Sequence, residues 1–261
     1  MSLATVILAI FAGSLTGLVL GLVGGGGSIL AVPLLIWVVG VSSTHEAIGT
    51  ASVAVALNAA IGLATHWRAG TVNWGCTMVF AAAGVIGAAI GAAIGKAVPG
   101  EPLLGLFGAL MLAVGLLMLR PRQIRGSDEI RLSAANAPHL LPRLLITGFG
   151  VGIMAGFFGI GGGFLIVPGL ILATGMATRN AIGSSLVGVT AFGTTTAASY
   201  AQSGLVLWPV AGLMLLGGAV GAAAGTVLGG RLGAMKGVLD RVFAGAVLIV
   251  GLQLVWHWAF G

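Results

Sequence analysis

A glycine-rich run that leads into a short apolar segment and a proline occurs twice in this chain, about half its length apart. The copies cover residues 24–33 and 159–168, and both lie in apolar sequence. Glycine allows close approach of two backbones and leaves main-chain N–H groups uncovered at a helix start, which suits an anion. The chain is therefore expected to contain one unit twice, with the two glycine turns as the first candidate site.

The duplication extends well beyond the glycine runs. Pro33 pairs with Pro168 and, after one skipped residue, the segment 47–50 pairs with 181–184, Gly70 with Gly204, and Trp74 with Trp208. Glycines at 87, 91 and 95 pair with those at 221, 225 and 229. Small residues at this spacing are packing faces of helices in lipid, and we prefer that interpretation to a ligand role. We predict two homologous repeats, 1–119 and 143–261, joined by a linker at 120–142.

The scarcity of charge assigns the class. Only 6% of residues are charged, 58% are hydrophobic and the mean hydropathy is +1.16. A water-soluble chain needs more polar surface, and a membrane barrel would alternate polar and apolar residues, so the fold class is an all-α polytopic membrane protein. The net charge of +6 is spread over segment ends, which favours a role in membrane orientation over nucleic-acid binding. The single cysteine, Cys76, excludes an internal disulfide.

Each half contains five helical segments, which gives eight to ten membrane segments in all. The segments lie near residues 2–23, 28–41, 46–67, 72–97, 102–119, 143–158, 163–175, 180–201, 205–230 and 236–258. The second segment of each half is too short for a comfortable crossing of about 30 Å. It is either a tilted span or one arm of a hairpin that dips into the membrane.

Basic residues choose between two topologies. If the first two segments of each half enter and return to one side, every Lys and Arg except Lys96 shares one face. If those segments make one broken crossing, the basic residues divide almost evenly. The positive-inside rule favours the first arrangement, with the linker in the cytoplasm and both termini outside. The two halves are then inverted, and the substrate site is expected at their interface near the midplane.

The two glycine-run-to-proline elements, the duplication and the length together resemble the TauE/SafE family of sulfite exporters. The resemblance covers essentially the whole chain. It implies a bacterial inner-membrane protein that moves sulfite, sulfonates or related small organic anions.

Main-chain N–H groups of the glycine turns are the first candidates for holding an oxyanion; the alternative is close helix packing around a tight reversal. Pro33 and Pro168 are expected to shape the short helices rather than bind. Polar groups of the third segments are candidate donors, although each can equally bond its own helix. The proposed substrate-binding residues are Gly25, Gly26, Gly27, Ser28, Gly161, Gly162, Gly163, Thr50, Asn58, Ser184, Ser185 and Thr194.

Asn58 is the strongest single candidate, because an amide in the middle of a span is costly without a partner. Arg68 and His66 form either an interfacial anchor or a funnel for anions. Glu46 is the candidate for coupling protons, or a residue of its helix's first turn.

The sequence thus favours a secondary transporter that moves a small sulfur oxyanion or organosulfonate by alternating access. The alternatives are a passive anion channel, or a carrier of another small organic anion or of a metal ion. We expect no enzyme activity, cofactor or metal site, because no Walker motif, mid-span histidine or serine–histidine pair is present. The expected partners are a small anion and the lipid bilayer, not nucleic acid, and the protein is a monomer or a homodimer.

Overall fold

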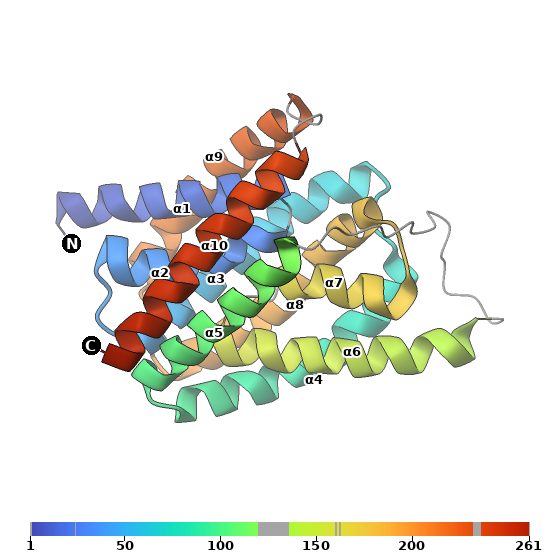
Figure 1. The fold of residues 1–261 in the computed structure, drawn as a ribbon, viewed down its shortest axis with the longest axis horizontal. Coiled ribbons are helices and arrows are strands. Elements are labelled where there is room, and N and C mark those ends of the chain that lie inside the picture. The colour runs from blue at the N-terminus through green and yellow to red at the C-terminus, as the bar shows by residue number, and fades with distance from the viewer. Residues whose placement is uncertain are drawn as a thin grey trace.

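The computed structural model describes residues 2–23, 25–119, 136–159, 161, 163–231 and 236–260. These residues form helices joined by short turns (Figure 1). Eight of the helices are 20–25 residues long: α1 (Leu3–Val23), α3 (Thr44–Arg68), α4 (Trp74–Ala97), α5 (Gly100–Leu119), α6 (Ala137–Phe158), α8 (Thr178–Gln202), α9 (Trp208–Arg231) and α10 (Lys236–Phe260). Seven of these eight are long and apolar enough to cross a membrane; α8 is the exception. The predicted all-α polytopic class is confirmed.

Two shorter elements complete the chain's described part, one in each half. In the first half, a 3-10 helix η1 (Gly25–Leu30), a single α-helical turn α2 (Ala31–Leu34) and a π-helical turn η2 (Leu35–Val39) follow one another. In the second half the equivalent element is α7 (Gly163–Thr174), a regular helix of 12 residues. At 1.5 Å per residue α7 extends about 18 Å, so it is too short to cross a bilayer.

The start of α6 differs from the prediction. The helix begins at Ala137, not near residue 143, so it includes the last residues of the predicted linker. Pro138 lies in its first turn, where a missing N–H costs nothing, because that group has no partner inside the helix. The sequence places residues 137–142 in the linker because they continue the only long polar stretch of the chain. The rest of that linker, 120–135, lies outside the described residues.

Glycines bring the backbones of α1 and α9, and of α4 and α6, into direct contact. A Cβ added at Gly17 would overlap the main chain of Gly218, and one added at Gly152 would overlap that of Gly84. Gly17 and Gly152 are repeat-equivalent, and so are Gly218 and Gly84. The glycines at 87, 91 and 95 of α4 also lie against the α6 backbone. The predicted interpretation of these ridges as packing faces is correct, since no larger side chain would fit.

The order of these contacts gives the direction of each helix. Gly13 lies at Met214 and Gly17 at Gly218, so α1 and α9 are parallel; the contacts of α4 with α6 rise together in the same way. By contrast, α3 and α8 are antiparallel. Gly49 at the start of α3 lies at Tyr200 near the end of α8, and Gly62 lies at Leu186.

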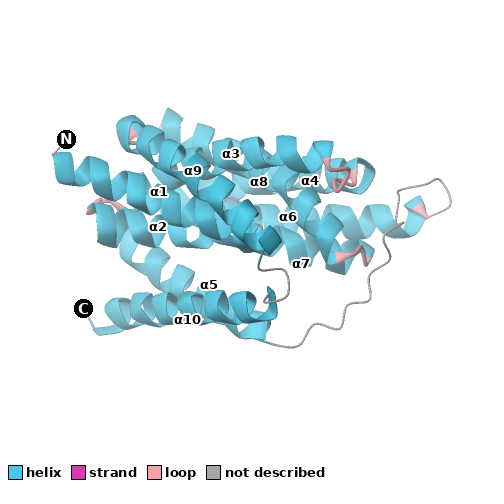
Figure 2. Ribbon diagram, turned by 90° about the horizontal axis from the view of Figure 1, so that it is seen from above, coloured by secondary structure: helices cyan, strands magenta, loops and turns pink. Residues whose placement is uncertain are grey.

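The most extensive contacts between helices of the two halves have equivalent contacts in which the first-half and second-half helices change places. Helix α1 packs on α9 as α6 packs on α4, and α3 packs on α9 as α8 packs on α4. The equivalent helices α3 and α8 pack on each other, as do α5 and α10, which lie side by side along one face of the molecule (Figure 2). Two inverted copies of one unit would pack in this way, because equivalent helices meet antiparallel.

Helices α1 and α3 run in the same direction, because both are parallel to α9. Along α3, Gly49 lies at Leu205, just before α9, and Asn58 lies at Gly218, farther along it. The short elements between them must therefore bring the chain back toward its starting side. A single broken crossing would have made α1 and α3 antiparallel. The basic residues favour an arrangement in which the first two segments enter and return to one side, and these directions agree with it.

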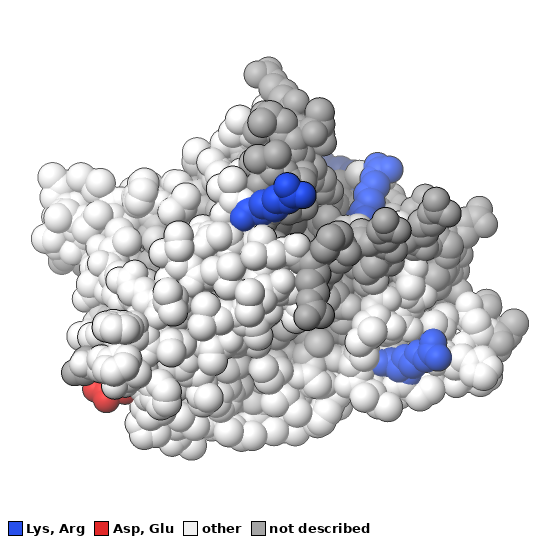
Figure 3. All heavy atoms as spheres, viewed as in Figure 1, with Lys and Arg blue, Asp and Glu red and all other residues white. Residues whose placement is uncertain are grey.

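Charged residues gather at the two ends of the bundle. The termini end contains the start of α1 and the end of α10, together with Glu46 and Glu101 at helix starts and Lys96 at a helix end. The linker end contains the end of α3 and the starts of α6, α8 and α10, with Arg68, Arg143, Arg179 and Arg241. On the face drawn in Figure 3, basic side chains lie away from the acidic residues near the termini.

The outside of the bundle is apolar. Large side chains such as Ile146 and Leu172 are exposed, at 72% and 78% of their surface. Tryptophans lie near helix ends and are also exposed: Trp37, Trp67, Trp74, Trp208, Trp256 and Trp258. An apolar belt flanked by tryptophan is the surface of a protein that spans a bilayer.

The glycine contacts predict a sharp difference between neighbouring positions of α6. Gly152→Ala should lower the free energy of unfolding by about 1–3 kcal/mol, because the new methyl group meets the Gly84 backbone. Gly150→Ala is the matched control, since a Cβ at Gly150 meets nothing within 4 Å. Thermal unfolding of the purified protein in detergent measures both changes. Equal melting temperatures for the two variants would contradict this packing.

Candidate functional site

The second glycine turn lies deep inside the bundle, between α3 and α8. Gly159 ends α6 in a left-handed conformation with φ of 64°, and Gly161 has the same φ. A Cβ on Gly161 would lie 3.3 Å from Val55 of α3 and 3.2 Å from Val189 of α8. Val55 and Val189 are repeat-equivalent and lie near the middle of two 25-residue helices. The turn between α6 and α7 therefore lies at mid-depth, which makes the pair a deep hairpin.

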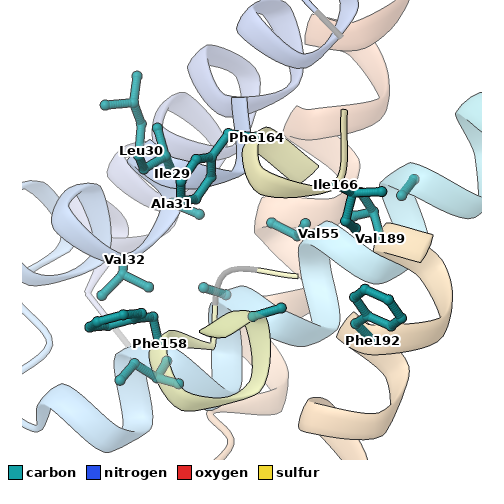
Figure 4. Close-up of a cluster of buried hydrophobic side chains, with 14 of the residues drawn as sticks. Ile29, Leu30, Ala31, Val32, Val55, Phe158, Phe164, Ile166, Val189 and Phe192 are labelled. Carbon is teal, nitrogen blue, oxygen red and sulfur yellow. The ribbon is translucent and has the colours of Figure 1, made fainter. Parts of the chain in front are cut away.

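The first glycine turn reaches the same region from the other half. Helix η1 packs against α7 and also contacts α8. In Figure 4, Ile29 and Ala31 of the first half lie close to Phe164 of α7, with Val55 and Val189 nearby. The structure thus brings the two glycine elements together. Gly162 lies outside the described residues, and for Gly25 and Gly26 only the backbone, within η1, is described.

Within the first turn, Gly27 has a packing role. A Cβ there would meet the main chain of α1 at Leu20 and Thr16. Ser28 is also buried, with 1% of its surface exposed. The alternative that we left open, close packing around a tight reversal, therefore holds for Gly27.

The centre contains no charged side chain among the described residues, since every Lys, Arg, Asp and Glu lies within about two turns of a helix end. The first turn of α7 begins there at Gly163, with main-chain N–H groups that have no partner inside the helix. Such a helix start attracts negative charge. The arrangement can therefore bind a small anion without a buried cation.

Thr50 and Ser184 make equivalent bonds that join the halves. The Thr50 hydroxyl accepts from the N–H of Leu207, just before α9, at 3.0 Å. The Ser184 hydroxyl accepts from the N–H of Asn73, just before α4, at 2.9 Å. Each therefore holds the start of a helix in the opposite half. Both predicted ligands have a structural bond in this conformation.

Ser185 and Thr194, which the sequence also predicts as ligands, do not face a common site. Ser185 donates to the carbonyl of Ile182 in its own helix at 2.8 Å, while Thr194 is exposed. Ser52, by contrast, donates to the carbonyl of Gly159 at 2.7 Å and so connects α3 to the second glycine turn. The hydroxyls therefore serve mainly to hold the elements around the centre.

Asn58 is the exception among the polar residues. Its side chain is buried, with 5% exposed, and Oδ1 has no hydrogen-bond partner among the described residues. The amide lies against Gly218, where α3 meets the α1–α9 contact. The repeat-equivalent residue is Phe192, which lies against Gly84. One half thus has a polar group where the other has an aromatic ring, and an unpaired buried acceptor is costly unless something binds it.

The two prolines shape their elements differently. Pro33 lies in the short turn α2, which a π-helical turn follows, so the first element is irregular. Pro168 lies inside the regular helix α7, where its missing N–H leaves the carbonyl of Phe164 without its helical donor.

The residues predicted for coupling or for a funnel lie at the helix ends. Glu46 lies in the first turn of α3, and its N–H donates to the Ser43 hydroxyl at 3.4 Å. Arg68 ends α3 and is exposed, while His66 Nδ1 bonds the Thr71 hydroxyl at 2.9 Å. They lie at opposite ends of the bundle and do not form one group. Within the described residues, no three His, Cys, Asp or Glu side chains lie close enough to hold a metal ion.

The sequence did not single out Tyr200. This residue is completely buried near the end of α8, and its ring stacks on that of His45. Its hydroxyl and His45 Nε2 have no hydrogen-bond partner among the described residues. The repeat register gave the one available signal, because it pairs Tyr200 with His66.

Comparisons with known proteins agree over the whole chain. The family model described as "Sulfite exporter TauE/SafE" matches residues 9–254. A probable membrane transporter protein of Xylella fastidiosa strain Temecula1 is 47% identical over 99% of this chain and 98% of its own length. The probable membrane transporter protein YdhB of Bacillus subtilis is 25% identical over 81% of this chain and 85% of its own. No solved structure gives a significant match.

The bonds of Thr50 and Ser184 predict similar losses from equivalent changes. Thr50→Val and Ser184→Ala should each lower the free energy of unfolding by about 1 kcal/mol, because a helix-start N–H loses its acceptor. Thr147→Val, which removes an exposed hydroxyl bonded within α6, is the control. Chemical unfolding in detergent measures the three variants. If Thr50→Val and Ser184→Ala unfold like the wild type, the two bonds do not hold the halves together.

Proposed function

Since the chain belongs to the sulfite exporter TauE/SafE family, we propose that it is a secondary transporter of a small sulfur oxyanion or organosulfonate. Transport takes place across the bacterial inner membrane by alternating access of two inverted halves. The proposal rests chiefly on the meeting of the two glycine elements inside the bundle. The second glycine turn lies between α3 and α8 at mid-depth, and η1 of the first element packs on α7 and contacts α8. In transporters built of inverted repeats, substrates bind at such an interface, with the starts of broken helices directed at anionic groups.

The chemistry of the centre supports an anion as substrate. A cation carrier needs carboxylates within its spans, whereas the described acidic residues lie at helix ends. Main-chain N–H groups at the start of α7 and the side-chain N–H groups of Asn58 are donors without a fixed charge, whereas Oδ1 of Asn58 can only accept. Such donors bind an oxyanion and also release it, because no buried ion pair has to be broken.

The orientation follows from the distribution of basic residues. The linker end carries Arg68, Arg143, Arg179 and Arg241, whereas the termini end carries Lys96 with two glutamates. By the positive-inside rule the linker end faces the cytoplasm and both termini face outside.

The proposed function is tested by measuring sulfite flux into proteoliposomes in which the purified protein is reconstituted. Sulfite uptake should saturate with concentration and respond to an imposed pH gradient. Flux that rises linearly with concentration and ignores the gradient would favour the channel alternative and contradict a carrier.

In the same assay, Asn58→Leu should reduce flux at least about tenfold, because it removes the side-chain N–H groups proposed to donate to the anion; this is the expected cost of losing a hydrogen bond to a charged ligand. Its melting temperature should stay equal or rise, because the change removes a buried acceptor that has no partner in the protein. Thr147→Val is the control and should transport normally. Normal transport by Asn58→Leu would exclude this residue from the site. A large loss of stability would assign it a structural role instead.

Orientation is tested with single cysteines in a Cys76→Ala background, since native Cys76 is buried. Glu101→Cys, at the termini end, should react with a membrane-impermeant maleimide in spheroplasts. His139→Cys, near the start of α6, should react only after the membrane is permeabilised. The reverse pattern would contradict the proposed topology.

A further inference from the structure

Three helices from both halves bring polar side chains together at the termini end. Tyr200 lies near the end of α8, His45 is the second residue of α3, and Lys96 is the next-to-last residue of α4. The rings of His45 and Tyr200 are 6.5 Å apart and nearly parallel, at 25°. The Lys96 ammonium lies 5.8 Å from the centre of the Tyr200 ring. This cluster lies about half a membrane away from the glycine turns, at the ends of the same α3–α8 pair.

Two polar atoms of this cluster are buried without a partner. Tyr200 has 0% of its surface exposed, yet its hydroxyl makes no hydrogen bond with the described residues. His45 Nε2 is also buried and has no hydrogen-bond partner among the described residues. Buried polar groups in folded proteins nearly always have a partner, so the unpaired hydroxyl and the unpaired nitrogen of these stacked rings are available to a bound species.

Lys96 gives that species its sign. Its ammonium donates to the Ser199 carbonyl at 2.9 Å and to the Ser203 hydroxyl at 2.8 Å. An ammonium has three donors, so the third has no partner among the described residues. A cation beside two groups that can donate favours a negatively charged ligand.

The equivalent cluster at the linker end lacks this feature. In the repeat register His66 corresponds to Tyr200, and Arg179 to His45. There, however, His66 Nδ1 bonds the Thr71 hydroxyl. The unpaired atoms at the termini end are therefore not a consequence of the repeat fold, which can satisfy the same positions.

We propose that Tyr200, His45 and Lys96 form a second oxyanion site on the transport path, at the end of the α3–α8 pair where both chain termini lie. The Tyr200 hydroxyl and His45 Nε2 donate to the anion, and Lys96 attracts it. The site deepens the transport function proposed above and depends on it. An anion that leaves the central glycine turns toward the termini end binds here before it is released.

The test compares binding of sulfite by purified wild type and by Tyr200→Phe, using isothermal titration calorimetry. Tyr200→Phe removes only the hydroxyl, so the melting temperature without ligand should not fall. Sulfite binding should weaken about tenfold or more, the loss expected for one hydrogen bond to a charged ligand. The control is Thr196→Val, which removes a buried hydroxyl of α8 that bonds its own helix at the Phe192 carbonyl.

Two variants of His45 distinguish the loss of its hydrogen-bond donor from the loss of its packing. His45→Gln keeps a donor and should retain most of the sulfite affinity, whereas His45→Leu should lose it as Tyr200→Phe does. Flux in proteoliposomes distinguishes the two levels of the proposal. If Tyr200→Phe binds and transports sulfite with wild-type constants, this second site is wrong while the transport function stands. If the wild type neither binds nor moves sulfite, sulfonates or related anions, the transport function itself is wrong.

Discussion

Direct contact between glycine backbones is the interaction on which this architecture depends. It joins α1 to α9 and α4 to α6, so each contact connects one half of the chain to the other. A bilayer offers no hydrophobic force between apolar helices, and close packing at small residues is what remains. Because α1 and α3 are both parallel to α9, the chain between them has to turn back inside the bundle. The hairpins at mid-depth thus follow from the way the halves pack.

The region around the glycine turns has no charged side chain among the described residues, so the proposed anion would be released without breaking an ion pair, as transport requires. Polar groups inside a membrane are costly, and here most of them bond the protein itself: Thr50 and Ser184 hold helix starts, and Ser52 holds the second glycine turn. What remains for an anion is a small set of main-chain donors and Asn58. The charged side chains stay at the two ends, where water can reach them.

Much of the fold could be predicted from the sequence, because apolar length and the internal repeat are visible without the structure. They predicted the ten segments in order, whereas the choice between a tilted span and a hairpin stayed open until the helices were placed. The start of α6 was predicted too late, because its first residues continue the long polar stretch that was assigned to the linker. The roles of Thr50 and Ser184 could not be predicted, since their partners Leu207 and Asn73 come from the opposite half. Tyr200 could not be predicted as a candidate for a similar reason. That its hydroxyl is buried without a partner becomes visible only when α3, α4 and α8 are packed together.

The proposed transport requires an oxyanion to bind at the glycine turns. Diffraction from crystals soaked in selenite, the selenium analogue of sulfite, would locate the anion through the anomalous signal of selenium. We expect a peak between α3 and α8, beside Gly161, with oxygens about 2.7–3.2 Å from main-chain nitrogens at the start of α7. Selenium found only at the surface of the bundle, with the space beside Gly161 empty, would contradict it.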